Sequence, residues 1–381
     1  MVGLRLGRAV GAGGCTVIKA PKPGKGIRMH ARSAIAPVLV AFVSLALSGG
    51  LCAAAVRDVT DPATEAFTAD LRKVALGVSI PDGRDLGQLD DFRASIGGQR
   101  VATWTIWSRW GDPGRNAFPM EAARGARARG AVPVIWWVPT PGEQYASHQN
   151  IIDGVHDEYI RAFAREARRY EHTLLLRFAH QANSDYLPWA WDYSETDGNT
   201  RGTFKRAWRY VHRIFRDVGA RNVKFVWTVA TQTCAGDGLE VSADVTNCLA
   251  RPLGYPGHRW VDYTGFTWEN WAEASPDSTV QSEPWITMLK GFRPIVRRLS
   301  AVSGKPILAV AIASAPDGGN RAKWIRRGYR GVYRHLPRIK AIMYLNVDLL
   351  GLGHRDWSLS GRSLEAYADI AATPRFQGRI R

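Results

Sequence analysis

Cysteine is scarce in this chain, with only 4 among 381 residues. Cys15 and Cys52 fall in an N-terminal segment that we expect to be removed, which leaves Cys234 and Cys248. No histidine lies between these two, so the pair is a poor zinc site, and we expect neither a metal ion nor a cofactor. In an oxidising compartment we expect the pair to form a disulfide, worth about 3 kcal/mol for a loop of about 15 residues, with two free thiols as the alternative.

Acidic residues are absent from residues 1–55, which hold several lysines and arginines. The uncharged stretch 34–56 follows Arg28 and Arg32 and ends in small residues at 53–55. A basic region, an apolar run and a small-residue cleavage site in this order are typical of a secretory signal. The apolar run is also long enough to cross a bilayer, so a retained anchor is the competing interpretation.

These observations divide the chain into three parts. We predict a signal segment or N-terminal extension over residues 1–55, with Met29 as an alternative start, a linker over 56–72 and one folded domain over 73–381. The protein is then expected to be secreted or associated with the cell envelope, and to contact a membrane only if the segment is not cleaved. We expect a monomer.

The chain also lacks a basic cluster of the kind found in nucleic-acid-binding motifs. Its formal net charge is +17, but the basic residues are spread along predicted helices and no recognition motif is present. We therefore expect no nucleic-acid partner. A basic surface of this size still favours anionic partners, and anionic cell-envelope polymers are the candidates.

No G-x-G-x-x-G motif follows the first predicted strand, which disfavours a doubly wound dinucleotide-binding sheet. Short apolar runs, typical of strands buried on both faces, instead alternate with amphipathic helices. This alternation predicts an α/β domain that is a single (β/α)8 TIM barrel. The predicted strands are 74–80, 101–107, 132–138, 173–178, 223–228, 263–267, 306–312 and 342–347, and the predicted helices are 118–129, 159–170, 204–218, 286–299 and 321–333.

Aromatic rings and amides follow several of the predicted strands, and the working face of such a barrel lies at the carboxyl ends of its strands. Flat rings stack on sugar rings and polar side chains bond to hydroxyls, so this pattern predicts a polysaccharide-binding cleft. Any single tryptophan could equally belong to the core. The predicted substrate-binding residues are Arg177, His180, Gln181, Asn183, Trp189, Trp227, Trp268, Trp271 and Asn346.

Several stretches within residues 76–359 resemble glycoside hydrolase family 26, the β-mannanase-type family. RFAHQANSDYLPW resembles the family element R-x-x-H-E-x-N-G-x-x-x-P-W, and KPILAVAIASAPDGGNRAKWI is similar to its seventh strand and the helix that follows. The resemblance implies a retaining glycosidase with a glutamate acid/base after strand four and a glutamate nucleophile at the end of strand seven. Such a mechanism needs the two carboxyl groups about 5–5.5 Å apart.

Both of these glutamate positions are changed in this chain. The acid/base position holds Gln181 and the nucleophile position holds Ala311. An amide has no proton to donate near neutral pH, and a methyl group cannot attack an anomeric carbon. The positions that match the family pattern are Arg177, His180, Asn183, Trp189, Trp227 and Asn346, whereas Ser184 replaces a glycine, and Phe266 and Trp268 stand where a tyrosine is expected.

Three functions follow from this pattern. The first is a catalytically inactive protein that binds a β-linked polysaccharide of the mannan or glucan type. The second is an active β-glycanase that uses displaced carboxylates, with Glu269 first and Asp185 and Asp317 after it, since an inverting mechanism tolerates a separation of about 6.5–9.5 Å. Each of these acids could equally be a solvated loop charge. The third is a non-catalytic scaffold in envelope polysaccharide assembly.

Overall fold

The computed structural model describes residues 73–80, 82–111, 117–141, 145–191, 198–231, 247–272, 284–350 and 355–380. The predicted signal segment and linker lie outside these residues. The prediction that the folded domain begins at residue 73 therefore stays a prediction.

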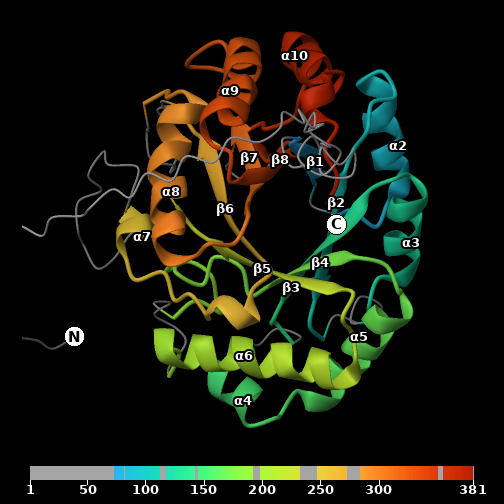
Figure 1. Cartoon of the computed structure of the whole chain (residues 1–381), viewed down its shortest axis with the longest axis vertical. Helices are drawn as coiled ribbons and strands as arrows, with labels where there is room; N and C mark the ends of the chain where they lie inside the picture. The colour runs from blue at the N-terminus through green and yellow to red at the C-terminus, as the bar shows by residue number, and fades with distance from the viewer. Residues whose placement is uncertain are drawn as a thin grey trace, which may run out of the picture. The chain divides into compact units, whose positions relative to one another are not determined.

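Eight parallel strands form a closed barrel in chain order (Figure 1). The predicted TIM barrel is therefore confirmed. The barrel closes between the first and last strands, where Ala75 lies opposite Ala341 and Ser79 lies opposite Leu345. The strands are β1 (Ala75–Ser79), β2 (Thr103–Arg109), β3 (Val132–Val138), β4 (Leu174–Phe178), β5 (Val223–Val229), β6 (Tyr263–Asn270), β7 (Ile307–Ser314) and β8 (Ile339–Leu345).

Helices surround the barrel (Figure 1). They are α2 (Leu86–Ser95), α3 (Met120–Ala128), α4 (His148–Ile152), α5 (Asp157–Arg169), α6 (Arg201–Val218), α7 (Asn247–Ala250), α8 (Met288–Val302), α9 (Arg321–His335) and α10 (Gly361–Ala371). Helices α2, α4, α7 and α10 are absent from the sequence prediction. In α2 only Leu89 and Phe92 are buried, which leaves little apolar periodicity to detect. None of the described helices has the length and hydropathy of a membrane span.

Polar caps fix where the main helices begin. Thr200 and Thr203 form a reciprocal capping box before α6, and Gly219, with φ of +83°, ends that helix in the left-handed conformation. The side chain of Asn320 accepts a hydrogen bond from the backbone N–H of Lys323 at the start of α9. These caps are local signals, which is why α6 and α9 are close to their predicted bounds.

The core has two layers, one inside the barrel and one between the strands and the helices. Neighbouring residues on a strand point to opposite faces, so Trp136 belongs to the inner layer. Trp137 belongs to the outer layer and stacks on Phe163 of α5 with ring centroids 4.6 Å apart. The inner layer also includes Val134, Leu175, Val226, Leu308, Val310, Ala311 and Met343.

Candidate functional site

Arg177 is a fully buried cation near the carboxyl end of β4. Its Nε donates to Oγ1 of Thr228 at 2.9 Å, and its guanidinium lies 4.0 Å from the ring centroid of Trp136. Burial lowers the pKa of Arg177 to about 9, against the opposing effects of Tyr186 and Glu269. Nη1 and Nη2 have no hydrogen-bond partner among the described residues. Two buried donors without acceptors can bond to a ligand hydroxyl or to an ordered water.

His180 lies among tryptophan rings beside Arg177. Its ring centroid is 5.9 Å from Trp107, 5.2 Å from Trp136 and 5.0 Å from Trp189. Burial, and then the charge of Arg177, hold the pKa of His180 well below its usual range. The imidazole is therefore neutral near pH 7. Trp107 is the one partly exposed ring among these three tryptophans.

Gln181 connects the end of β4 to β6. Its Nε2 donates to Oγ1 of Thr267 at 2.5 Å and to the hydroxyl of Tyr186 at 3.2 Å. Its backbone has a φ of +54°, in the left-handed region that non-glycine residues rarely adopt. The backbone N–H bonds to the carbonyl oxygen of Thr228 on β5 at 3.1 Å, which holds this conformation.

Ala311 has the same unusual backbone, with a φ of +58°. It lies at an irregularity in β7, because the pairing register with β8 shifts between Ala309 and Ile312. A bulge of this kind re-aims a side chain, and the Ala311 methyl group joins the inner layer of the barrel. A non-glycine residue in this conformation costs about 1–3 kcal/mol, so the surrounding barrel imposes it.

Asn183 and Trp189 hold the loop that follows β4. The amide nitrogen of Asn183 donates to the carbonyl oxygens of Ala230 and Cys248, and its amide oxygen accepts from the backbone N–H of Ala230. The indole N–H of Trp189 donates to the carbonyl oxygen of His180 at 2.7 Å. Both side chains are buried, so the structure places them in support of the loop rather than at an open surface.

The predicted stacking residues Trp227 and Trp268 lie on the outer face of the barrel. Trp227 packs edge-on against Tyr255, with ring centroids 5.0 Å apart. Trp268 is 0% exposed and stacks on Trp324 of α9, with centroids 6.2 Å apart. The sequence prediction counted tryptophans at strand ends without assigning each to a face, and alternation turns these two away from the barrel axis.

Trp271 and Asn346 are partly exposed beyond the ends of β6 and β8, and their predicted binding roles stay predictions. Trp271 packs edge-on against Trp357, with centroids 4.9 Å apart. The amide oxygen of Asn346 accepts from the backbone N–H of Leu359 at 2.7 Å.

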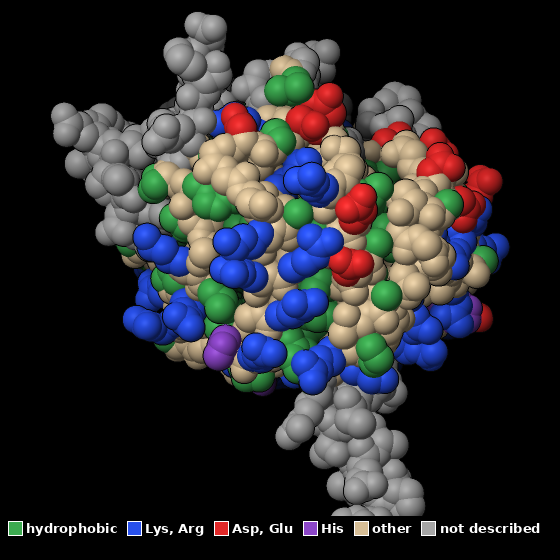
Figure 2. Space-filling model, turned by 90° about the horizontal axis from the view of Figure 1, so that it is seen from above, with side chains coloured by type: hydrophobic (Ala, Val, Ile, Leu, Met, Phe, Trp, Pro, Cys, Tyr) green, Lys and Arg blue, Asp and Glu red, His purple; other side chains and the backbone are tan. Residues whose placement is uncertain are grey.

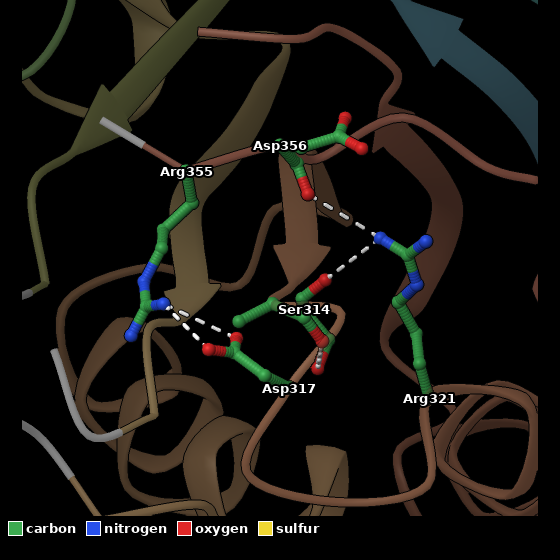
Figure 3. Close-up of polar contacts among 6 residues, drawn as sticks. Ser314, Asp317, Arg321, Arg355 and Asp356 are labelled. Carbon is green, nitrogen blue, oxygen red and sulfur yellow. Dashed lines mark hydrogen bonds and ion pairs between the residues drawn. The ribbon is translucent and has the colours of Figure 1, made fainter. Parts of the chain in front are cut away.

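The three candidate acids lie in different surroundings. Glu269 is partly exposed on β6, two residues beyond Thr267 and therefore on the same inward face. Asp185 lies 3.9 Å from Arg251. The carboxylate of Asp317, in the loop after β7, accepts from Nη1 of Arg355 at 2.9 and 3.1 Å (Figure 3). Of these three acids, Glu269 is therefore the one on the same face of β6 as Thr267, the hydrogen-bond partner of Gln181.

Sequence reasoning missed four residues that contact the predicted site. Tyr186 is 49% exposed and bonds to Gln181, and Trp107 packs over His180. Thr228 and Thr267 supply the hydroxyl groups that fix Arg177 and Gln181. The inward direction of both threonines follows from the same alternation that turns Trp227 and Trp268 outward, so the signal was present in the strand pattern.

The predicted disulfide and the expected absence of metal concern other parts of the chain. Cys248 is buried, whereas Cys234 lies outside the described residues, so the bridge stays a prediction. In the part of the chain that the structure describes, no group of His, Cys, Asp and Glu side chains is arranged to hold a metal ion.

Comparisons with known proteins show which structures this barrel resembles. No protein-family model matches the chain. Solved structures with a similar fold include family 26 mannanases. One is mannanase man26 from Bacillus subtilis, with a TM-score of 0.52, 16% identity and coverage of 78% of this chain and 87% of that one. Another is the GH26 β-mannanase BoMan26A from Bacteroides ovatus, with a TM-score of 0.56, 14% identity and coverage of 81% and 91%.

A curated relative is similar in sequence. Endoglucanase H from Acetivibrio thermocellus is 32% identical over 244 residues, which are 63% of this chain and 24% of that protein. The chain therefore spans about a quarter of the length of this relative. Together with the structural neighbours, this match confirms the resemblance to glycoside hydrolase family 26 that the motifs predicted.

Proposed function

We propose that this chain is a secreted, catalytically inactive protein of the family 26 type that binds a β-linked polysaccharide, of the mannan or glucan type, at the mouth of its barrel. The observation that carries the proposal is the pair of positions Gln181 and Ala311. Each has the left-handed backbone of a specialised site, and neither carries a carboxyl group.

The chemistry of glycoside hydrolysis explains why these two residues matter. A retaining enzyme needs one carboxyl group to protonate the leaving oxygen and another to attack the anomeric carbon. The Gln181 amide can supply neither a proton nor an effective nucleophile, and it is hydrogen-bonded to Thr267 and Tyr186. Ala311 presents a methyl group. The site therefore keeps the backbone geometry without the reacting groups.

Groups suited to holding a sugar remain beside these two positions. Arg177 has two buried Nη atoms whose N–H groups have no acceptor among the described residues. The partly exposed rings of Trp107 and Tyr186 offer flat apolar faces, of the kind that stack on pyranose rings. A neutral His180 adds no charge to this wall, where the cation of Arg177 has the carboxylate of Glu269 nearby. The arrangement supports binding of a neutral glycan.

An active β-glycanase is the second candidate, and Glu269 is the observation that favours it. This carboxylate lies on the inward face of β6 near Arg177, and its charge partly opposes the lowering of the Arg177 pKa by burial. A glycosidase of this type also needs a second carboxyl group within about 10 Å. Asp185 and Asp317 each lie beside an arginine, so neither is an evident partner for Glu269.

The test measures binding and hydrolysis separately on the full chain. Titration calorimetry with soluble manno- and gluco-oligosaccharides reports binding, and release of reducing ends reports turnover. We expect binding without release, and loss of binding in Trp107→Ala and Tyr186→Ala. Tyr210→Ala on α6 is the matched control, because this ring lies on the outside of the barrel.

Two outcomes would redirect the proposal. Turnover by the wild-type chain that disappears in Glu269→Gln would identify an active glycanase. Absence of both binding and turnover with every neutral glycan would favour the scaffold role in polysaccharide assembly.

A further inference from the structure

Helix α9 carries a one-sided row of basic side chains. Lys323, Arg327, Arg330 and Arg334 follow one another at steps of four, three and four residues, and all are exposed. This spacing puts them on one face, along about 16 Å of helix at 1.5 Å per residue. The helix contains no acidic residue. The expectation that basic residues are merely scattered along the helices is therefore wrong for α9.

The row borders hollows in the surface. A hollow of about 850 Å³ lies between α9 and the start of α10, and its lining includes Lys323, Arg326, Arg327, Arg330 and Arg362. A smaller hollow of about 200 Å³ continues from Arg330 to Arg334 and Arg375. We call these two hollows together the basic groove. Its basic residues are Lys323, Arg326, Arg327, Arg330, Arg334, Arg362 and Arg375.

Figure 2 shows the molecule from the side of α9 and α10, which lie at the top of Figure 1. Lys and Arg side chains gather over the middle and lower part of this face, and acidic side chains lie mostly toward its upper and right edges. This face therefore carries an excess of positive charge.

Few internal contacts neutralise this charge. Asp369 of α10 accepts from Arg326 at 2.8 and 3.0 Å, which joins the two walls of the groove. The buried Arg321 donates to the carbonyl oxygens of Ser314 and Asp356 and fixes the start of α9 (Figure 3). Within the described residues, the four side chains of the exposed row make no recorded ion pair or hydrogen bond.

Such a row weakens the helix that carries it. Like charges four residues apart on a helix destabilise it by about 0.2–0.5 kcal/mol per pair. Lys323 with Arg327 and Arg330 with Arg334 are two such pairs. An anionic ligand along the row would remove this cost, since each arginine presents a fork of N–H donors that matches a carboxylate.

We propose that the basic groove binds a linear acidic polysaccharide, one that bears carboxylate groups along its length. An elongated groove of one sign matches a polymer that carries repeated charges of the other sign. A single-stranded nucleic acid or an inserted membrane surface fits less well, because these partners call for exposed aromatic or apolar side chains that stack or insert. Duplex DNA needs only phosphate contacts, and the experiment below includes it as the competing partner. The large exposed hydrophobic residues of the described chain are Tyr145, Val155, Tyr186 and Leu350, and none of them lies on α8, α9 or α10.

The experiment titrates the full chain with polygalacturonate, a linear polyuronate, at two salt concentrations. Polyanion binding releases counterions, so affinity should fall on the order of tenfold or more between 50 and 200 mM salt if about four charges are engaged. The test variant is R327E/R334E. The matched control is R206E/R213E on α6, which has the same seven-residue spacing, the same residue type and the same change in charge, on exposed positions of another helix.

We expect R327E/R334E to lose at least about tenfold in affinity and the control to stay within about twofold of the wild type. Equal losses in both variants would show a response to net charge alone and overturn the proposal, as would no binding by the wild type. Tighter binding of double-stranded DNA or of anionic phospholipid vesicles would assign the groove to that partner instead. If R327E/R334E unfolds, R327Q/R334Q repeats the comparison against R206Q/R213Q.

The groove and the barrel mouth are tested independently. Binding of a neutral mannan oligosaccharide should be unchanged in R327E/R334E, because neither residue lies near Gln181 in the fold. A chain that binds no neutral glycan can still bind polygalacturonate, so failure of the proposed function leaves the groove proposal standing.

Discussion

Nε2 of Gln181 lies 2.5 Å from Oγ1 of Thr267, so the side chain at the family's acid/base position is tied to the strand that also carries Glu269. A glutamate acting as acid/base must keep an oxygen available to the substrate. Here the amide is instead part of a hydrogen-bonded bridge between β4 and β6. The Gln181 side chain is therefore held in the wall of the site by two hydrogen bonds.

This bridge predicts an energetic coupling between the two residues. Thr267→Val, which is nearly isosteric, should lower the free energy of unfolding by about 1 kcal/mol because it removes one buried hydrogen bond. Combined with Gln181→Ala, the two changes should be non-additive by at least about 0.5 kcal/mol. Urea denaturation of the wild type, the two single variants and the double variant measures both the loss of stability and the non-additivity. Gln181→Ala with Thr140→Val serves as an additive control, and strict additivity in the first cycle would mean that the bridge contributes nothing.

Restoring both carboxyl groups should restore weak hydrolysis. Gln181→Glu with Ala311→Glu is expected to release reducing ends from the glycan that the site binds, whereas each single change is not, since the reaction needs both groups. The double variant Gln181→Glu with Ala311→Gln adds similar volume without a nucleophile and is the matched control. Equal release by this control would trace the activity to a contaminant or to another acid.

Substitution by alanine should have different effects at the buried Trp268 and at the partly exposed Trp107. Trp268→Ala should cost about 3–5 kcal/mol of stability, because it opens a cavity between β6, α8 and α9. The fraction that remains folded should still bind glycan. Trp107→Ala should cost less stability and remove binding, since this ring is partly exposed beside His180. Thermal unfolding and calorimetry on the same samples separate the effects, and loss of binding in folded Trp268→Ala would contradict its placement.

Stability should fall in mildly acidic solution. Burial lowers the pKa of His148 and of His212 to about 4, against a usual value of 6.5. The unfolded chain therefore binds more protons than the folded one between these values. The stabilisation is complete above about pH 6.5 and is lost as the pH falls towards 4, by up to about 3 kcal/mol for each histidine.

Urea midpoints measured from pH 7 to pH 4 test this dependence. His148→Gln should reduce the slope, because one of the histidines with a lowered pKa is gone. His335→Gln, an exposed histidine at the end of α9, should leave the slope unchanged. A wild-type midpoint that does not change across this range would contradict the expectation.

The sequence predicts the barrel well because its signals are local. Apolar runs bounded by turn residues place β3 at Val132–Val138, and caps place α6 and α9 near their true ends. The strands β6 and β7 extend three and two residues beyond the predicted 263–267 and 306–312, because their polar or small ends, Asn270 and Ser314, do not look like strand residues. Their hydrogen bond, from Nδ2 of Asn270 to Oγ of Ser314 at 2.9 Å, depends on tertiary pairing.

The site was predicted in part for the same reason. Arg177, His180 and Gln181 are close in sequence and therefore meet at one strand end. Trp268 lies on the outer face of β6, and the alternation along the strand already indicates this, because the neighbouring Thr267 and Glu269 point inward. The exposure of Tyr186 depends on the packing of the whole loop, so it could not be read from residue type.

The left-handed backbone at Gln181 and Ala311 also determines how the site can be rebuilt. The direction in which each side chain leaves the main chain is set by the bonds of the barrel and by the bulge in β7, not by the identity of the side chain. A substitution at either position therefore changes the functional group but keeps the direction in which the side chain leaves the backbone. Side chains with other reactive groups can therefore be introduced at these two positions one at a time, on a backbone that the barrel holds in place.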